Sequence, residues 1–229
     1  MHSTKNNLLV LHEDNHLIIV NKRPGDIVQG DKTGDKPLSD VVKEYIKDKY
    51  NKPGNVYLGT VHRLDRPTSG VVIFARTSKA LERLNKMLRE KKIQKTYFAV
   101  VKGPLKKKEG TLVNFLKKNP KNNKSTAYSK EIDGSKKSIL HYKVIKELDN
   151  YSLLEIDLET GRHHQIRCQL STIGFPIKGD LKYGFSRSNK NGSIHLHARK
   201  ISFTHPVSKE LIEIKAPLPK NDSIWEACN

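Results

Sequence analysis

The sequence predicts an α+β fold built on a large, mainly antiparallel mixed sheet that helices and loops flank. Short β-forming runs dominate the chain, and turn residues join several of them, as is typical of antiparallel strands. A few helical segments are interspersed among these runs. The 229 residues contain no internal repeat and no obvious linker, so we expect a single domain over residues 1–229.

Apolar, β-branched runs bounded by turn residues mark the strands. Predicted strands occupy residues 8–13, 16–22, 55–64, 70–76, 94–103, 139–148, 151–159, 195–206 and 210–217. Two of the connections are tight turns, at Asp14–Asn15 and at Asp149–Asn150. The last two strands are expected to form a closing hairpin.

Three segments have the apolar periodicity of helices. A helix over residues 38–50 is expected to begin at the N-cap Ser39, and one over residues 78–92 at the cap Ser78. The third helix is expected within residues 162–174. Its apolar face would consist of Ile166, Leu170 and Ile173.

Residues 106–137 are polar and rich in lysine, and predict loops or a two-stranded excursion from the sheet. Two interpretations have equal weight for this segment. It is either a solvated insertion or an arm that grips the substrate.

Charge is the strongest signal in the composition. Lys and Arg number 43 against 24 Asp and Glu, which gives a formal net charge of +19. Such an excess favours a polyanionic partner, first nucleic acid and second an anionic membrane surface. The alternative is a lysine-rich surface that is merely solvated.

Several protein classes are disfavoured. No run approaches 18 consecutive apolar residues, and the N-terminus lacks the apolar core of a signal peptide. The two cysteines, Cys168 and Cys228, form neither a disulfide framework nor a CxxC metal site. We therefore expect a cytoplasmic protein.

The segment "VHRLDRPTSG", residues 61–70, places Asp65 between Arg63 and Arg66 at a turn. Neighbouring guanidinium groups favour an ionised carboxylate, which can serve as nucleophile, base or electrostatic stabiliser. The alternative is an aspartate that caps the turn by binding backbone near Thr68.

The segment "ETGRHHQIRCQL" gathers a second set of polar side chains at the start of the third helix. The set consists of Arg162, His163, His164 and Arg167. Arginine can hold a carboxylate or a phosphate with its planar fork, although a solvated basic helix face is the alternative. The histidines lack the spacing of a zinc site, so no metal is expected. Tyr97 is either a core tyrosine or a ring on which a base stacks.

Taken together, these segments resemble the RluA family of RNA pseudouridine synthases. "HRLDRPTSG" looks like the catalytic motif, "KTYFAVVKG" the second and "GRHHQIRCQLSTIGFPIKGDLKYG" the third. "IIVNKRPGDIV" resembles the opening motif and "LHARKISFTHPVSKE" the closing strands, so that the similar core spans about residues 8–219. The order of the five motifs is far more specific than any one of them.

The resemblance implies a pseudouridine synthase fold around a central catalytic cleft, with base flipping of the target uridine. It implies that Asp65 is the catalytic aspartate, that Tyr97 lies beside the uracil and that Arg167 pairs with the aspartate. Arg63 would enter the RNA stack after the target flips out. Such enzymes need no metal and no cofactor. The residues expected to bind RNA are Arg63, Arg66, Arg162, His163, His164, Lys117 and Lys118.

The sequence departs from the family pattern in three places. These are the "NKRPG" of the opening motif, His163, and the pair Cys168–Gln169, where the family has a pair ending in His. The resemblance begins at about Leu8, so we expect no RNA-binding module of S4 type before the catalytic domain. We expect a monomer that acts on ribosomal or transfer RNA. The alternatives are a catalytically silent RNA-binding protein or RNA chaperone with the same fold, and a hydrolase of glycosidic bonds in nucleic acid, although no second carboxylate is placed as its general acid.

Overall fold

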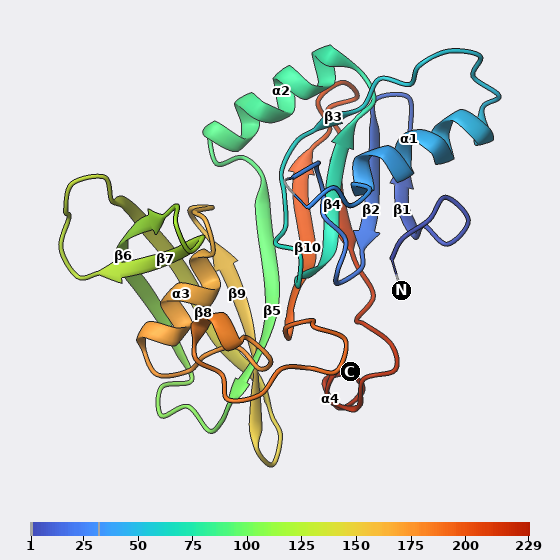
Figure 1. Cartoon of the computed structure of the whole chain (residues 1–229). Helices are drawn as coiled ribbons and strands as arrows, with labels where there is room; N and C mark the ends of the chain where they lie inside the picture. Colours follow the sequence, from blue (N-terminus) through green and yellow to red (C-terminus); the bar gives the residue numbers. More distant parts are fainter. Residues whose placement is uncertain (1, 32) are drawn as a thin grey trace. The chain divides into compact units, whose positions relative to one another are not determined.

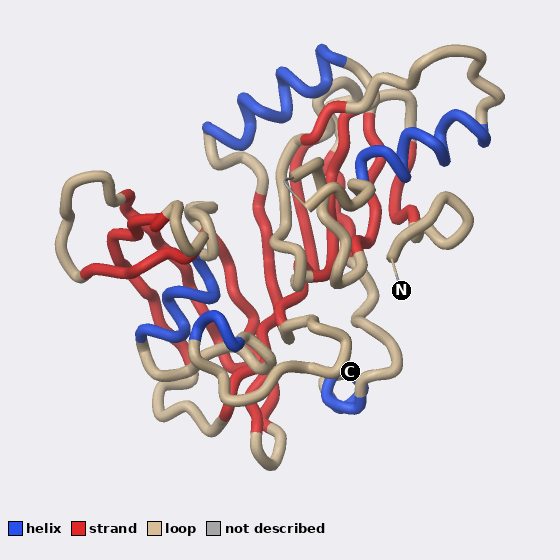
Figure 2. Tube along the Cα trace, in the orientation of Figure 1, coloured by secondary structure: helices blue, strands red, loops and turns tan. Residues whose placement is uncertain are grey.

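The computed structural model describes residues 2–31 and 33–229, which form two compact units (Figure 1). The first unit comprises Met1–Ile93 and Ala198–Leu218, and the second comprises Gln94–His197 and Pro219–Asn229. Strands dominate both units (Figure 2), and helices accompany them, so the predicted α+β class is confirmed. That residues 1–229 act as a single domain stays a prediction.

The first unit is built on antiparallel strands with a helix against each face. Its strands are β1 (Val10–Glu13), β2 (Leu17–Lys22), β3 (Gly59–Thr60), β4 (Ser69–Ala75), β10 (Leu196–Thr204) and β11 (Leu211–Lys215). Strand β2 lies between β1 and β4, β3 also pairs with β4, and β11 pairs with β10. The helices are α1 (Leu38–Lys49) and α2 (Ser78–Arg89).

Both faces of strands β2 and β4 are buried, which explains why their sequences are continuous apolar runs. Ile18 of β2 and Phe74 of β4 belong to the core under α1. Their neighbours Ile19 and Ile73 point the other way and belong to the core under α2. This doubly covered pair of strands is the rigid base from which the loop of Asp65 emerges.

The second unit is an antiparallel sheet with the strand order β5-β9-β8-β6-β7. These strands are β5 (Gln94–Lys102), β6 (Glu109–Asn119), β7 (Lys124–Tyr128), β8 (Lys136–Glu147) and β9 (Tyr151–Leu158). The other elements are α3 (Gln165–Thr172), the 3-10 turn η1 (Leu181–Tyr183) and α4 (Ser223–Ala227). Helix α3 packs on β6 and β7 through Cys168 and Leu116.

The structure resolves the lysine-rich segment in favour of the two-stranded alternative. Strand β6 extends over eleven residues and pairs with both β7 and β8. The two turns predicted at Asp14–Asn15 and Asp149–Asn150 are confirmed as antiparallel connections, as is the closing hairpin of β10 and β11.

Several predicted details are wrong. Helix α1 follows Pro37 and contains Ser39, while α2 is capped by Thr77, whose side chain accepts from Ala80 N. Ser and Thr are also acceptable in the first turn of a helix. A serine in the first turn can therefore be mistaken for the N-cap, which lies one or two positions earlier. Ile173 is 37% exposed and does not share the buried face of α3. Of the strand expected over residues 55–64, only Gly59–Thr60 pairs.

Within the described part of the chain, none of the helices combines the length and the apolar character needed to cross a membrane.

Candidate active site

Asp65 lies in the loop between β3 and β4, in the first unit. The Thr68 N–H donates to the Asp65 carbonyl oxygen at 3.0 Å and closes a tight turn. Because the backbone oxygen closes this turn, the closure does not depend on the carboxylate. The Asp65 side chain is partly buried, and Thr68 directly after the turn is 2% exposed. Burial of Thr68 therefore anchors one end of the loop in the core, and the partly buried Asp65 side chain lies at the start of the same turn.

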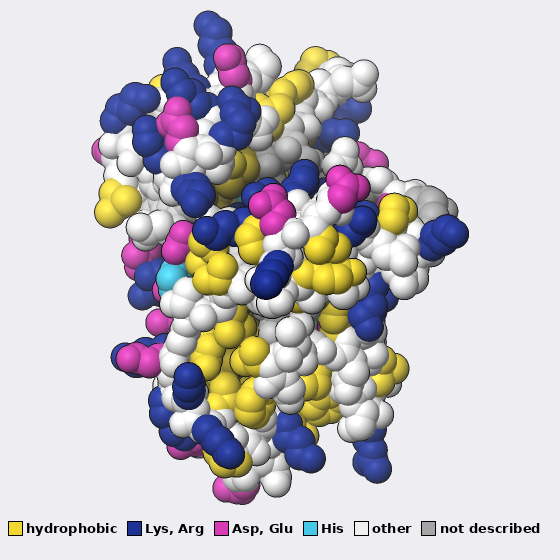
Figure 3. Space-filling model, turned by 90° about the vertical axis from the view of Figure 1, so that its left-hand side faces the viewer, with side chains coloured by type: hydrophobic (Ala, Val, Ile, Leu, Met, Phe, Trp, Pro, Cys, Tyr) yellow, Lys and Arg dark blue, Asp and Glu magenta, His cyan; other side chains and the backbone are white. Residues whose placement is uncertain are grey.

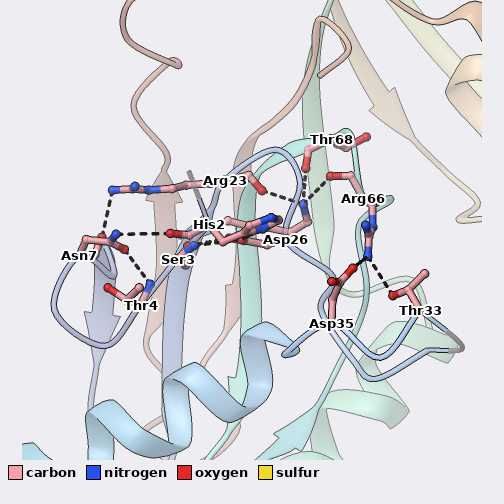
Figure 4. Close-up of polar contacts among 11 residues, drawn as sticks. His2, Ser3, Thr4, Asn7, Arg23, Asp26, Thr33, Asp35, Arg66 and Thr68 are labelled. Carbon is pink, nitrogen blue, oxygen red and sulfur yellow. Dashed lines mark hydrogen bonds and ion pairs between the residues drawn. The ribbon is translucent and has the colours of Figure 1, made fainter. Parts of the chain in front are cut away.

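A buried lysine binds the backbone of this turn. Lys22, at the end of β2, is 1% exposed. Its ammonium donates to the carbonyl oxygens of Thr68 at 2.7 Å and Arg66 at 3.1 Å, and to that of Arg23 at 2.9 Å (Figure 4). Three carbonyl acceptors satisfy the three protons of the ammonium. The backbone on both sides of the turn is thus tied to the sheet.

Lys22 also places a positive charge near Asp65. Burial lowers the pKa of Lys22 to about 7, and the carboxylates of Asp26 and Asp65 oppose that fall. The sequence pattern points only to the neighbouring arginines for positive charge beside Asp65 and does not single out the lysine of "NKRPG".

A close backbone approach fixes the far end of the loop. Gly70 has a φ of +114°, and a Cβ atom there would lie 2.3 Å from the carbonyl oxygen of Ala198. No other residue fits this position without moving β10 or β4. The glycine of "RPTSG" is therefore required by the close approach of β4 to its neighbour β10.

The N-terminal segment binds the loop that follows Lys22. Asp26, 5% exposed, accepts from Ser3 N at 3.0 Å and Ser3 Oγ at 2.6 Å, and contacts His2 Nδ1 at 3.2 Å (Figure 4). The Arg23 guanidinium donates to the Asn7 carbonyl oxygen at 3.2 Å. The arginine of "NKRPG", which departs from the family pattern, is Arg23, and it binds the N-terminal segment.

The two arginines that flank Asp65 in sequence have different surroundings. Arg66 donates to Thr33 Oγ1 at 3.0 Å and forms an ion pair with Asp35 (Figure 4). Arg63 is exposed. Arg66 is thus tied to the loop before α1, and Arg63 is accessible to a large ligand.

The second unit holds the other two predicted catalytic residues. Tyr97 lies in the middle of β5, opposite Ile156 of β9, and is 8% exposed. Arg167 lies in the first turn of α3 and is 5% exposed. A side chain this deeply buried does not belong to a solvated basic helix face, which was the alternative for Arg167.

A bidentate ion pair fixes the guanidinium of Arg167. Its Nε and Nη2 donate to the two carboxylate oxygens of Asp180 at 2.7 and 2.9 Å, and Asp180 is 1% exposed. The Tyr183 ring lies against the same guanidinium, with 5.1 Å between the ring centroid and Cζ. Two parallel hydrogen bonds and a ring face leave the guanidinium one orientation. Asp180 and Tyr183 lie in the "GDLKYG" of the third motif, but the sequence alone gave them no role.

Tyr183 also connects the hairpin of β6 and β7 to the start of α3. Its hydroxyl accepts from Ser125 N at 2.8 Å and lies 3.0 Å from His164 Nδ1. Burial raises the pKa of Tyr183 to about 12, so the hydroxyl stays protonated at neutral pH. The Lys124 ammonium lies over the same ring at 5.1 Å.

The histidines that precede α3 form a stacked pair. His164, at the N-cap, has a left-handed φ of 53°, and its ring lies 3.8 Å from that of His163. His163 Nδ1 lies 2.9 Å from Ser125 Oγ. Arg162 is exposed and donates from Nε to the Lys137 carbonyl oxygen at 3.2 Å. Each of the three thus contacts another part of the second unit: Ser125 of β7, Tyr183 of η1 or Lys137 of β8.

The remaining two predicted RNA-binding residues, Lys117 and Lys118, are exposed near the end of β6. Figure 3 shows Lys and Arg side chains spread over one face of the molecule, with fewer acidic ones among them. Successive strand residues point to opposite faces, so these two lysines project to opposite sides of the hairpin.

The departure at Cys168–Gln169 has a structural explanation. Gln169 is fully buried and donates from Nε2 to Asn114 Oδ1 at 2.8 Å and to the Leu112 carbonyl oxygen at 3.1 Å. Cys168 Sγ contacts the Ser125 carbonyl oxygen at 3.2 Å. Both side chains attach α3 to the sheet.

Across residues 2–31 and 33–229, no group of three or more His, Cys, Asp or Glu side chains is arranged to hold a metal ion.

The fold is that of the pseudouridylate synthases. The solved structure of human RNA Pseudouridylate Synthase Domain Containing 4 superposes with a TM-score of 0.77 at 22% sequence identity, covering 93% of this chain and 89% of that chain. The family model of RNA pseudouridylate synthases matches residues 16–172. The chain belongs to this family, in its RluA branch, and is an isomerase of the RNA pseudouridine synthase class.

Two bacterial relatives illustrate the similarity. The ribosomal large subunit pseudouridine synthase C of Buchnera aphidicola subsp. Baizongia pistaciae is 38% identical over 225 residues, which cover 93% of this chain and 67% of the relative. The tRNA pseudouridine synthase C of Yersinia pestis is 31% identical over 237 residues, covering 96% of this chain and 88% of the relative. The chain spans 69%, 65% and 68% of the length of three further curated relatives.

Proposed function

We propose that this protein converts specific uridines in ribosomal or transfer RNA to pseudouridine, with Asp65 as the catalytic aspartate. The observation that carries the proposal is the buried support of the Asp65 turn. Lys22 and Gly70 fix the backbone on both sides of it. Burying a lysine costs free energy, and a turn that only connected two strands would not need one bound to its backbone.

The reaction balances without a second substrate. The C1′–N1 bond of uridine breaks, the uracil turns, and a C1′–C5 bond forms. The proton on C5 leaves and N1 takes up a proton, so no oxidant, reductant or energy source is consumed. An ionised Asp65 assists by attacking the electron-poor centre or by removing the proton.

The target base must leave the RNA stack before Asp65 can reach it. Flipping a base costs a few kcal/mol, which contacts to the RNA backbone and a side chain inserted in the gap can offset. Arg63 is exposed two residues before Asp65 and is the side chain that we assign to the gap. Tyr97 is assigned to the uracil, and Arg167 to the carboxylate of Asp65.

The basic surface supplies the affinity for RNA. With a net charge of +19, the chain is suited to a polyanion. Arg66, Arg162, His163, His164, Lys117 and Lys118 are the side chains that we assign to the RNA. The names of two relatives mention the large ribosomal subunit and tRNA, which are therefore the two substrates to test.

The site that we propose takes all its groups from one chain, so a monomer suffices. Both cysteines are free and buried, which fits a reducing cytoplasm. Together the two units would then act as one catalytic domain.

Pseudouridine mapping tests the proposal. Total RNA from a strain that lacks the gene should lose pseudouridine at one or a few positions, and the purified protein should restore it on RNA from that strain. Tritium release from C5-labelled uridine should accompany the reaction. An unchanged map and no tritium release would favour the silent RNA-binding alternative, whereas release of free uracil would indicate a hydrolase.

A further inference from the structure

Lys95 lies in the second unit on the same strand as Tyr97 and on the same face. The two residues are separated by one position in β5, and alternate residues of a strand point to the same side. Their Cα atoms are therefore about 7 Å apart along the strand. Whatever ligand touches the Tyr97 ring passes close to the Lys95 side chain.

The ammonium of Lys95 lies next to the first residue of the third motif. A Cβ atom built on Gly161 would be 3.4 Å from Lys95 Nζ, so the ammonium is beside the backbone of Gly161. Arg162 follows directly and is exposed. The second and third motifs meet at this ammonium.

Lys95 differs from the other buried lysine in its partners. Lys22 donates to three carbonyl oxygens. Lys95 has no hydrogen bond and no ion pair with any residue in 2–31 or 33–229, although its side chain is partly buried. Burial lowers the pKa of Lys95, and no carboxylate counters the effect. Partial burial of an ammonium that lacks a partner destabilises the folded chain.

A destabilising charge of this kind is expected where it meets a ligand. We propose that Lys95 binds a backbone phosphate of the RNA at the flipped uridine. The assignment rests on the proposed function for the identity of the ligand as RNA. The lysine has no anion of its own, and every nucleotide that reaches Tyr97 brings a phosphate with it.

The first test compares Lys95→Met with Lys102→Met, an exposed lysine at the end of the same strand. The probe is a short RNA stem-loop with a single uridine in the loop. Lys95→Met should weaken binding and flatten the slope of log affinity against log salt by about 0.7–0.9. Lys102→Met should leave both close to wild type, and Lys95→Arg should retain most of the affinity because it keeps the charge.

The melting temperature separates a binding role from a structural one. Because Lys95→Met removes an unpaired charge and keeps an unbranched side chain, its melting temperature should equal or exceed that of the wild type. A structural lysine would give the opposite result. A clear fall in melting temperature would therefore overturn the proposal even if binding also weakened.

A neutral phosphate analogue locates the contact. Stem-loops that each carry one methylphosphonate near the uridine should weaken wild-type binding at several positions. At one of these positions Lys95→Met should show no further loss, because the contact is already absent. If every substitution weakened the variant as much as the wild type, Lys95 would not bind a phosphate.

The pH dependence gives an independent readout. The lowered pKa means that Lys95 loses its charge at a lower pH than an ordinary lysine. Wild-type affinity should fall at alkaline pH more steeply than that of Lys95→Arg, which stays charged. Equal profiles would count against the assignment.

If wild-type protein formed no pseudouridine yet all binding results held, the isomerase proposal would fail and the phosphate site would stand.

Discussion

At the scale of single residues, the site depends on pairings between side chains far apart in sequence. Lys22 binds carbonyl oxygens 44 and 46 residues further along the chain, and Arg167 binds Asp180. Lys22 has a carbonyl acceptor for each of its three protons, and Arg167 forms a bidentate ion pair. Removing one partner is expected to cost more than the pair itself contributes.

Asp65→Asn should abolish pseudouridine formation and leave RNA binding largely intact. Asparagine has nearly the same shape but lacks the charge, and the backbone oxygen that closes the turn is retained. Tritium release from C5-labelled uridine and a binding titration measure the two effects separately. Substantial turnover by the variant would mean that another group performs the chemistry.

Arg167→Met should be nearly inactive and less stable by about 3–5 kcal/mol, because it leaves the buried Asp180 carboxylate unpaired. Asp180→Asn should also lose stability. Because the two residues form one ion pair, the double variant should lose less stability than the sum of the two single variants. Urea denaturation of the four proteins measures the coupling. Strict additivity would show that the pair does not exist in solution.

Lys22 should make stability depend on pH in a defined direction. Its pKa is about 7 in the folded protein and near 10.5 when unfolded. Between these values the unfolded chain binds more protons, so this group raises stability as pH rises, by at most about 1.4 kcal/mol per pH unit. Below pH 7 both states are protonated and the contribution no longer changes.

The comparison with Lys22→Met isolates that contribution. The difference in unfolding free energy between wild type and variant should grow in favour of the wild type from pH 7 to pH 9.5. Urea denaturation at several pH values measures it. A constant difference would indicate that Lys22 titrates normally in the folded protein.

At the scale of elements, the hairpin of β6 and β7 projects lysines and is anchored at its base. Ser125 and Lys124 contact Tyr183, which in turn lies against Arg167. The exposed lysines further out, Lys117, Lys118 and Lys121, have no such packing role. The hairpin can therefore be tested for RNA affinity without disturbing the environment of Arg167.

Replacing Lys117, Lys118 and Lys121 with Ser should flatten the salt slope by roughly one to two units, since each lost phosphate contact contributes about 0.7–0.9. The single-turnover rate at saturating RNA should change little. The control replaces three exposed lysines of the first unit, Lys47, Lys52 and Lys79. If both triple variants behaved alike, the hairpin would be only a solvated extension.

At the scale of the whole molecule, the net charge of +19 and the family membership point to the same polyanionic substrate. We expect full activity in excess EDTA, because the proposed chemistry uses a carboxylate and no metal site. The substrate should be a short RNA whose folding does not need magnesium. Loss of activity that only zinc restored would contradict this expectation.

The sequence by itself determined most of the strands, the motifs and the class of enzyme. Runs such as "LIIV" and "VVIFA" determine buried strands because hydrophobic periodicity is a local property. The order of the motifs identified Asp65, Tyr97 and Arg167 as candidates. The cap predicted at Ser78 is at Thr77, because adjacent hydroxyl residues are nearly equivalent at the start of a helix. The cap predicted at Ser39 is wrong because that helix begins after Pro37, with no side-chain cap.

Only the tertiary structure decided which groups surround those candidates. Lys22 supports the Asp65 turn, Asp180 orients Arg167, and Lys95 is partly buried beside Gly161 without a partner of its own. Nothing local distinguishes these residues from the many other lysines and acids of the chain. Burial and hydrogen bonding depend on segments that meet only after folding. An exposed ammonium is solvated by water, whereas a buried ammonium without a partner costs free energy.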